Sequence, residues 1–147
     1  MRYLLITIIF VLFAHNAHAS SLIVGGVSYH AAEVYNDNGV IREFNAKNQL
    51  LAVEHNGWLA GAMKNSYYEN VVFVGYHKQK SVGRYLKLGA LVMGSTGYDE
   101  LRSETIDFEV PQIAGLTPAV YATVQAGPVF LLISPAKVAV ATLRFEF

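Results

Sequence analysis

The chain has 147 residues, and its 11 Lys and Arg residues balance 11 Asp and Glu residues, so its formal net charge at pH 7 is zero. This balance gives no electrostatic case for binding nucleic acid. The absence of cysteine excludes a lipid-modified cysteine, a disulfide framework and thiolate metal sites. After residue 19, apolar residues come in short alternating runs that are too short for a spanning helix but typical of the strands of a membrane barrel.

Residues 1–19 have the pattern of a secretory signal peptide. Arg2 provides a positive charge, residues 4–13 form a short apolar core, and Ala17-His18-Ala19 has the small residues that precede a cleavage site. We therefore expect the mature protein to begin at Ser20 and to form a single domain, residues 20–147. Such a chain suits the envelope of a Gram-negative cell.

Alternation and turn residues predict eight strands in the mature chain, at residues 22–34, 45–54, 57–65, 70–79, 84–96, 112–125, 128–134 and 138–147. The strongest hairpin signal is Asn56-Gly57, because Asn-Gly accepts the positive φ angles of a tight turn. Short turns are also expected at residues 79–83 and 126–128. Longer connections at 35–44 and 98–110 alternate with the short ones, so one rim carries short turns and the other carries most of the loops.

The final strand gives the most specific indication of the fold. Leu143, Phe145 and Phe147 alternate with more polar residues up to the carboxyl terminus. In a transmembrane barrel these three side chains face lipid, the polar ones face the lumen, and the terminal aromatic lies in the interfacial girdle. The alternative is an ordinary sandwich strand with one buried face. We favour an all-β fold, an eight-stranded antiparallel transmembrane β-barrel in the outer membrane.

This layout brings two distant segments to the same rim. With a periplasmic amino terminus, the first and third strands run outward. His30, near the outer end of the first strand, then meets residues 64–66 at the outer end of the third.

Several short motifs occur in a particular order along the mature chain. They are Tyr29-His30-Ala31 with Tyr35, Asn56-Gly57-Trp58, Ala62-Met63-Lys64-Asn65-Ser66, Gly75-Tyr76, Leu86-Lys87-Leu88-Gly89 and Leu143-Arg144-Phe145-Glu146-Phe147. No single motif is specific, but their order and spacing resemble those of the PagP family, the outer-membrane lipid A palmitoyltransferases. The resemblance covers nearly all of the mature chain.

The resemblance implies an acyltransferase that moves a fatty acyl chain from a phospholipid to lipid A, as a monomer without cofactor or metal. The family's catalytic His, Asp and Ser fall on His30, Asn65 and Ser66. A histidine can act as a general base, and a nearby hydroxyl can act as nucleophile or oxyanion partner, so these residue types suit acyl transfer. Asn65 replaces the family's Asp. An amide can orient a hydroxyl or an imidazole by hydrogen bonding, but it carries no charge.

The resemblance also assigns four residues to substrate binding. Gly75 matches a family glycine, and His77 stands where the family has a glycine at the floor of its acyl pocket, so an imidazole there shortens the accepted chain. The alternative is that His77 bonds a neighbour such as Glu54. Pro118 and Pro135 correspond to prolines that interrupt the strand ladder and open a lateral gate for phospholipid. Pro135 alternatively just begins a turn.

Two other functions stay open at this point. One is a non-catalytic barrel of the same fold that alters the cell surface or blocks a receptor, and measuring the mass of lipid A distinguishes it from the enzyme. The other is a soluble periplasmic barrel that binds a small apolar ligand, which membrane fractionation would reveal. The sequence contains no metal-ligand spacing, phosphate-binding glycine loop or nucleophile elbow.

Overall fold

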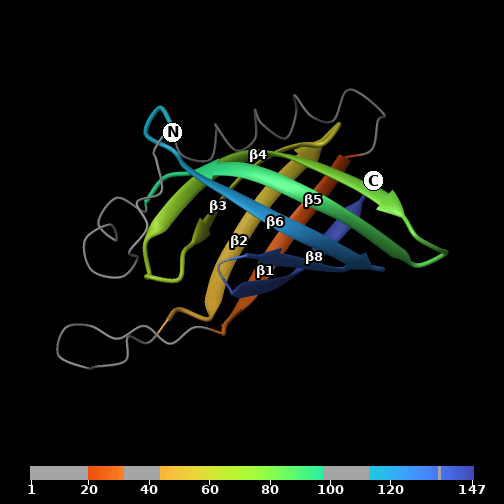
Figure 1. The fold of residues 1–147 in the computed structure, drawn as a ribbon, viewed down its shortest axis with the longest axis horizontal. Helices are drawn as coiled ribbons and strands as arrows, with labels where there is room; N and C mark the ends of the chain where they lie inside the picture. The colour runs from red at the N-terminus through yellow and green to blue at the C-terminus, as the bar shows by residue number, and fades with distance from the viewer. Residues whose placement is uncertain (1–19, 32–43, 98–112, 136) are drawn as a thin grey trace.

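The computed structural model describes residues 20–31, 44–97, 113–135 and 137–147. They form a single closed barrel of eight antiparallel strands, in which each strand pairs with its neighbours in the chain and the last strand pairs with the first (Figure 1). The strands are β1 (Ser20–His30), β2 (Lys47–His55), β3 (Trp58–Lys64), β4 (Asn70–Ser81), β5 (Leu86–Ser95), β6 (Thr117–Ala126), β7 (Val129–Ser134) and β8 (Val138–Glu146). The predicted eight-stranded antiparallel barrel is confirmed.

The two ends of the barrel differ in their connections. The turn rim is the end that carries the connections at residues 56–57, 82–85 and 127–128, and there Ser20 and Phe147 also bond each other's backbones. The opposite end, the loop rim, carries the chain between β1 and β2 and between β5 and β6. The expected signal peptide and most of both long connections lie outside the described residues. No helix within the described ranges is long and apolar enough to cross a membrane.

The predicted tight turns are largely confirmed, with one shift. Asn56 and Gly57 have φ angles of 51° and 83° and join paired residues His55 and Trp58, as expected of a two-residue hairpin. The turn expected at 79–83 lies at 82–85 instead, because β4 continues to Ser81. The polar residues at the end of β4 resemble a turn in the sequence, but they are polar because they lie at the rim.

Alternate side chains along the strands divide sharply in character. Each of the eight strands has apolar side chains in its outward row, although polar residues occur in that row near the rims; the exposed apolar members include Val27, Leu51, Trp58, Val74, Val92, Val120, Ile133 and Leu143. On β8 the exposed Leu143 and Phe145 alternate with the buried Thr142 and Arg144, as the sequence predicted. An apolar surface that encircles a barrel is far larger than the patches that monomeric soluble proteins expose.

The inside of the barrel has three layers along its axis. The middle layer is an apolar core to which all eight strands contribute. A network of buried charged and polar side chains fills the lumen toward the turn rim, and a smaller polar group lies at the loop rim. This layering places the candidate site at one end of an apolar interior.

Candidate functional site

His30 and Ser66 form the candidate catalytic pair at the loop rim. His30 is the last residue of β1, Ser66 follows β3, and the His30 Nε2 atom lies 2.6 Å from the Ser66 Oγ atom in a half-buried contact. The meeting of these two segments at one rim is thereby confirmed. A neutral imidazole at this distance can accept the hydroxyl proton, which is the arrangement that activates a serine as a nucleophile.

A β-bulge turns His30 toward the lumen. Ile23 faces inward and is 2% exposed, so strict alternation from Ile23 would point His30 outward. The ladders to β2 and β8 both shift register before Val27, at Gly25 and Gly26, whose φ angles are 85° and 127°. Between Val24 and Val27, β1 has one residue more than the facing part of β8, and this extra residue reverses the alternation, because a one-residue shift moves every later side chain to the other face.

Two aromatic residues support the imidazole. The ring of Phe44, just before β2, stacks on His30 with a centroid distance of 4.3 Å and an interplanar angle of 12°. Tyr67 contacts the Phe44 ring edge-on at 5.7 Å. Sequence reasoning missed Phe44, since nothing in its local pattern links it to a residue 14 positions earlier.

Asn45 fixes the turn that carries Ser66. The Asn45 backbone N–H donates to the Ser66 carbonyl at 2.8 Å, and its Nδ2 donates to the Asn65 carbonyl at 3.0 Å. Ser28 of β1 donates its hydroxyl to the Asn45 carbonyl at 3.0 Å. Sequence reasoning also missed this residue, which connects the strand of the histidine to the turn of the serine.

Asn65 is fully buried, and its side chain points into its own turn. Its Oδ1 accepts from the backbone N–H groups of Tyr67 and Glu69, both at 2.9 Å, while its Nδ2 donates to the Gly97 carbonyl at 3.0 Å. Among the described hydrogen bonds, none joins the Asn65 side chain to His30 or Ser66. The expected direct orientation of the pair by Asn65 is therefore not what the geometry shows, and Asn65 instead shapes the turn that presents Ser66.

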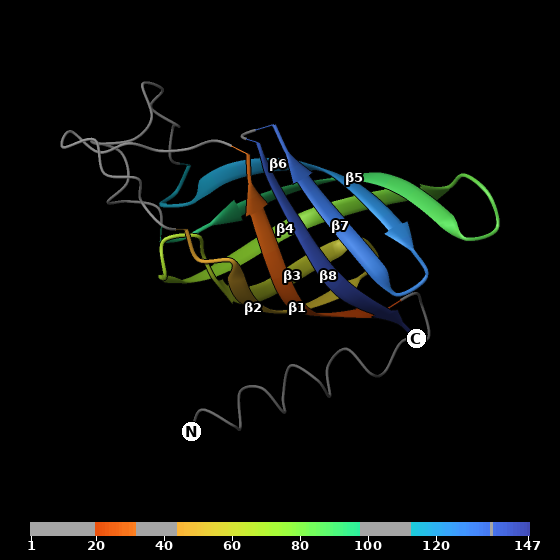
Figure 2. The same ribbon diagram turned by 90° about the horizontal axis from the view of Figure 1, so that it is seen from below.

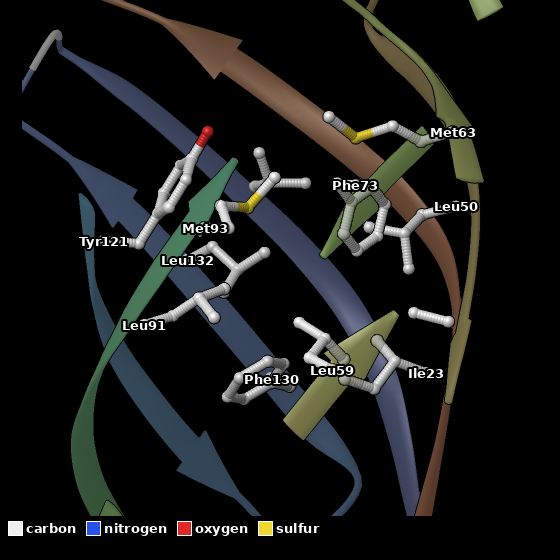
Figure 3. A pocket seen from close by; sticks show the side chains of 12 residues that line it. Ile23, Leu50, Leu59, Met63, Phe73, Leu91, Met93, Tyr121, Phe130 and Leu132 are labelled. Atoms are coloured by element: carbon white, nitrogen blue, oxygen red, sulfur yellow. The ribbon is translucent and has the colours of Figure 1, made fainter. Parts of the chain in front are cut away.

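An apolar cavity of about 30 Å³ lies in the middle layer, within the interior that the pair borders (Figure 3). Every strand contributes to its lining of 12 side chains, of which only Tyr121 carries a hydroxyl. Met63 and Met93 point into this space (Figure 3). Methionine side chains are unbranched and flexible, so this lining can rearrange around a hydrocarbon chain.

His77 lies beneath the cavity rather than in its lining. Phe130 lines the cavity, and its ring contacts the His77 ring at a centroid distance of 5.3 Å. The Nδ1 atom of His77 lies 3.1 Å from Glu54 Oε2, and its Nε2 atom lies 3.0 Å from Thr123 Oγ1. The alternative interpretation, a histidine bonded to Glu54, is confirmed, and Phe130 takes the floor position that the resemblance implied for residue 77.

Gly75 is buried on the lumen side of β4, where no side chain fits. A Cβ atom at this position would come within 2.6 Å of the Val92 carbonyl oxygen and 2.7 Å of the Met93 Cβ atom. Gly75 therefore allows β5 to approach closely and keeps Met93 in the cavity wall, which is a packing role beside the cavity.

Charged residues close the lumen at the turn rim. Arg144 donates from Nη2 to Glu54 Oε1 at 2.9 Å, and its Nη1 lies 3.1 Å from Glu146 Oε1. Lys87 also pairs with Glu146, at 2.6 Å, but this pair is more exposed. Among the described residues, no group of His, Asp and Glu is placed to hold a metal ion.

The barrel wall has an unpaired stretch on its loop-rim half. β6 pairs with β7 only from Ala122 onward, so residues 117–121, including Pro118, pair with β5 alone among the described strands. Pro135 directly follows β7 in the turn before β8, so its alternative interpretation as a turn residue is confirmed. Pro118 lies on this unpaired stretch of β6 and Pro135 follows the end of β7, at the place where the resemblance implies a lateral gate.

No protein-family model matches the sequence, and no curated protein is detectably similar to it.

Proposed function

We propose that this protein is an outer-membrane acyltransferase, resembling PagP, that transfers a fatty acyl chain from a phospholipid to lipid A. The observation that carries the proposal is the 2.6 Å contact between His30 and Ser66 at the loop rim of a barrel with an apolar core. A hydroxyl next to a general base supplies the chemistry, and the apolar interior supplies a place for the chain of the donor lipid.

In the proposed reaction, Ser66 is the nucleophile and His30 is the general base. The Ser66 hydroxyl gives its proton to His30 Nε2 while its oxygen attacks the ester carbonyl of the phospholipid. The lysophospholipid leaves and takes that proton, so the acyl chain stays on Ser66. A lipid A hydroxyl then gives a proton to His30 and attacks the acyl-serine, and the Ser66 oxygen recovers a proton as it leaves.

The surface of the barrel supports placement in a membrane. Apolar side chains face outward on all eight strands, and a closed barrel leaves no unpaired edge in the hydrocarbon region apart from the stretch of β6. Short turns lie at one rim, which in outer-membrane barrels faces the periplasm. The pair at the opposite rim then faces the outer leaflet, where lipid A is found, and the donor lipid enters past Pro118 and Pro135.

Lipid A from expressing cells, analysed by mass spectrometry, tests the proposal. Wild type should produce a species heavier by one acyl chain, and Ser66→Ala and His30→Ala should each abolish it. His55→Ala is the matched control, because His55 also contacts a serine hydroxyl, that of Ser20 at 3.0 Å, but at the turn rim. Folding is checked on a denaturing gel, where the unboiled sample of a folded barrel migrates differently from the boiled sample.

A non-catalytic barrel is the second candidate, and one observation favours it. Among the described residues, no carboxylate bonds His30 to complete a triad, and the Asn65 side chain points into its own turn. Unchanged lipid A in several hosts, from protein verified as folded in the membrane fraction, would decide for this candidate. Recovery of the protein as a monomer in water without detergent would instead reject the membrane placement itself.

A further inference from the structure

The β4–β5 hairpin extends beyond β3 at the turn rim (Figures 1 and 2), while its β5 arm stays paired with β6 as far as Leu86. The last pair between β3 and β4 joins Trp58 to Tyr76, whereas β4 continues to Ser81. In this extension β4 pairs with β5 only. We call residues 78–88 the projecting hairpin.

The projecting hairpin carries a surplus of positive charge on its exposed surface. Lys78 and Lys80 are exposed residues in the outward row of β4, and Arg84 is exposed in the turn. None of these three forms an ion pair with a described residue. They therefore present three uncompensated cations.

The acidic residues of the same rim cannot neutralise this surplus. Glu54 is buried and pairs with Arg144, and Glu146 pairs with both Arg144 and Lys87. Both carboxylates are thus occupied by cations other than the three on the projecting hairpin. The described part of the turn rim keeps its net positive charge at the projecting hairpin.

The basic residues directly continue the apolar outer surface. The outward row of β4 runs from Val72 and Val74 through Tyr76 to the two lysines. In the turn, the Arg84 guanidinium lies 5.3 Å from the centre of the exposed Tyr85 ring. Along this surface, side chains change from apolar to aromatic to basic. This order matches the change from hydrocarbon through the interface to the phosphate groups of a lipid leaflet.

We propose that the projecting hairpin binds the phosphate groups of anionic phospholipids in the leaflet at the turn rim. The inference rests on the membrane placement in the proposed function but not on the acyltransferase activity. Lysines on an unpaired strand edge also discourage pairing with another sheet. If the lysines only protect the edge, their removal should cause the protein to self-associate and leave lipid binding unchanged. If they form the proposed site, their removal should weaken lipid binding.

Native mass spectrometry of the mature protein in detergent tests the site, with phosphatidylglycerol and phosphatidylcholine as probes at equal concentrations. Wild type should retain phosphatidylglycerol in preference to phosphatidylcholine. The hairpin variant, Lys78→Gln/Lys80→Gln/Arg84→Gln, should lose that preference. Each basic residue near an anionic surface contributes roughly a fivefold change in affinity, so removing all three should lower the affinity for phosphatidylglycerol by about a hundredfold.

The matched control has the same change of charge at the other rim, as Lys47→Gln/Lys64→Gln/Lys137→Gln, and should keep the preference. Equal loss in both variants would overturn a local site. Displacement of the lipid by inorganic phosphate alone, at the same concentration, would show that the hairpin is an adventitious anion site. Dimers of the hairpin variant with unchanged lipid binding would show that the lysines only protect the strand edge from pairing. Either result would overturn the proposal. A folded protein that needs detergent but shows no lipid preference contradicts only this inference.

Discussion

The buried ion pair between Glu54 and Arg144 should be far more important for stability than the exposed pair at the same rim. The side chains of Glu54 and Arg144 are 7% and 4% exposed, whereas Lys87 and Glu146 are 32% and 40% exposed. Removing one partner of a buried pair leaves a desolvated charge and costs about 3–5 kcal/mol. Exposed pairs contribute less than about 1 kcal/mol.

The position of each partner refines these magnitudes. Glu54→Gln should cost about 3 kcal/mol of unfolding free energy, the lower end, because Glu146 still lies 3.1 Å from Arg144. Arg144→Met should cost about 4–5 kcal/mol, since among the described residues Glu54 keeps only His77 as a partner and Gln125 loses the donor that Arg144 provides. The double variant should cost about 2–3 kcal/mol less than the sum, because residues in contact couple by up to about 3 kcal/mol.

Urea unfolding in detergent micelles measures these differences. Trp58 is the only tryptophan of the chain and reports the transition by fluorescence. Lys87→Met is the matched control, because it removes a cation from the exposed pair. The reasoning is refuted if Glu54→Gln and Arg144→Met destabilise the barrel no more than Lys87→Met, or if their effects add without coupling.

Three further predictions concern the site. Asn65→Asp should lower the free energy of unfolding by about 1–3 kcal/mol and reduce lipid A product, because a carboxylate cannot donate to the carbonyl that the buried amide now bonds; increased product would show that its charge reaches His30. Deleting Gly26 should remove the bulge, turn His30 outward and abolish the acylated lipid A product. The unboiled variant should still migrate as a folded barrel. Retained product would contradict the argument that the bulge turns His30 toward the lumen. His77→Gly should leave the length of the transferred chain unchanged and Phe130→Ala should lengthen it, as mass analysis of the product can show; the opposite result would place the floor at His77.

The strands could be predicted because their signal is local. Alternation with period two is visible within each strand, and Asn56-Gly57 specifies its turn through φ angles that few residue pairs adopt. The effect of the bulge could not be predicted from such a local pattern alone. Gly25-Gly26 within a strand is a signal for one, but only the pairing of β1 with both neighbours shows that the alternation reverses there.

The site could be predicted only in part, for a related reason. The contact between His30 and Ser66 could be predicted, because the directions of antiparallel strands determine which strand ends lie at the same rim. The side chain of Asn65 could not be placed that way, since a carboxamide bonds whichever backbone groups its own turn leaves free. Phe44 and Asn45 lie at the end of the long connection between β1 and β2, and no local sequence pattern predicts their contacts.

The two polar groups inside the barrel differ in a way that separates stability from function. The turn-rim network is buried. Its ion pairs join β2, β4 and β8, a hydrogen bond from His77 to Thr123 adds β6, and together with Phe130 these side chains fill the turn-rim end of the lumen in the described part of the barrel. The His30–Ser66 pair is half-buried and lies at the loop rim. A single hydrogen bond there contributes only about 1 kcal/mol, so stability alone gives little reason to place a base and a hydroxyl in contact at the loop-rim side of an apolar core. The proposed acyl transfer does give a reason.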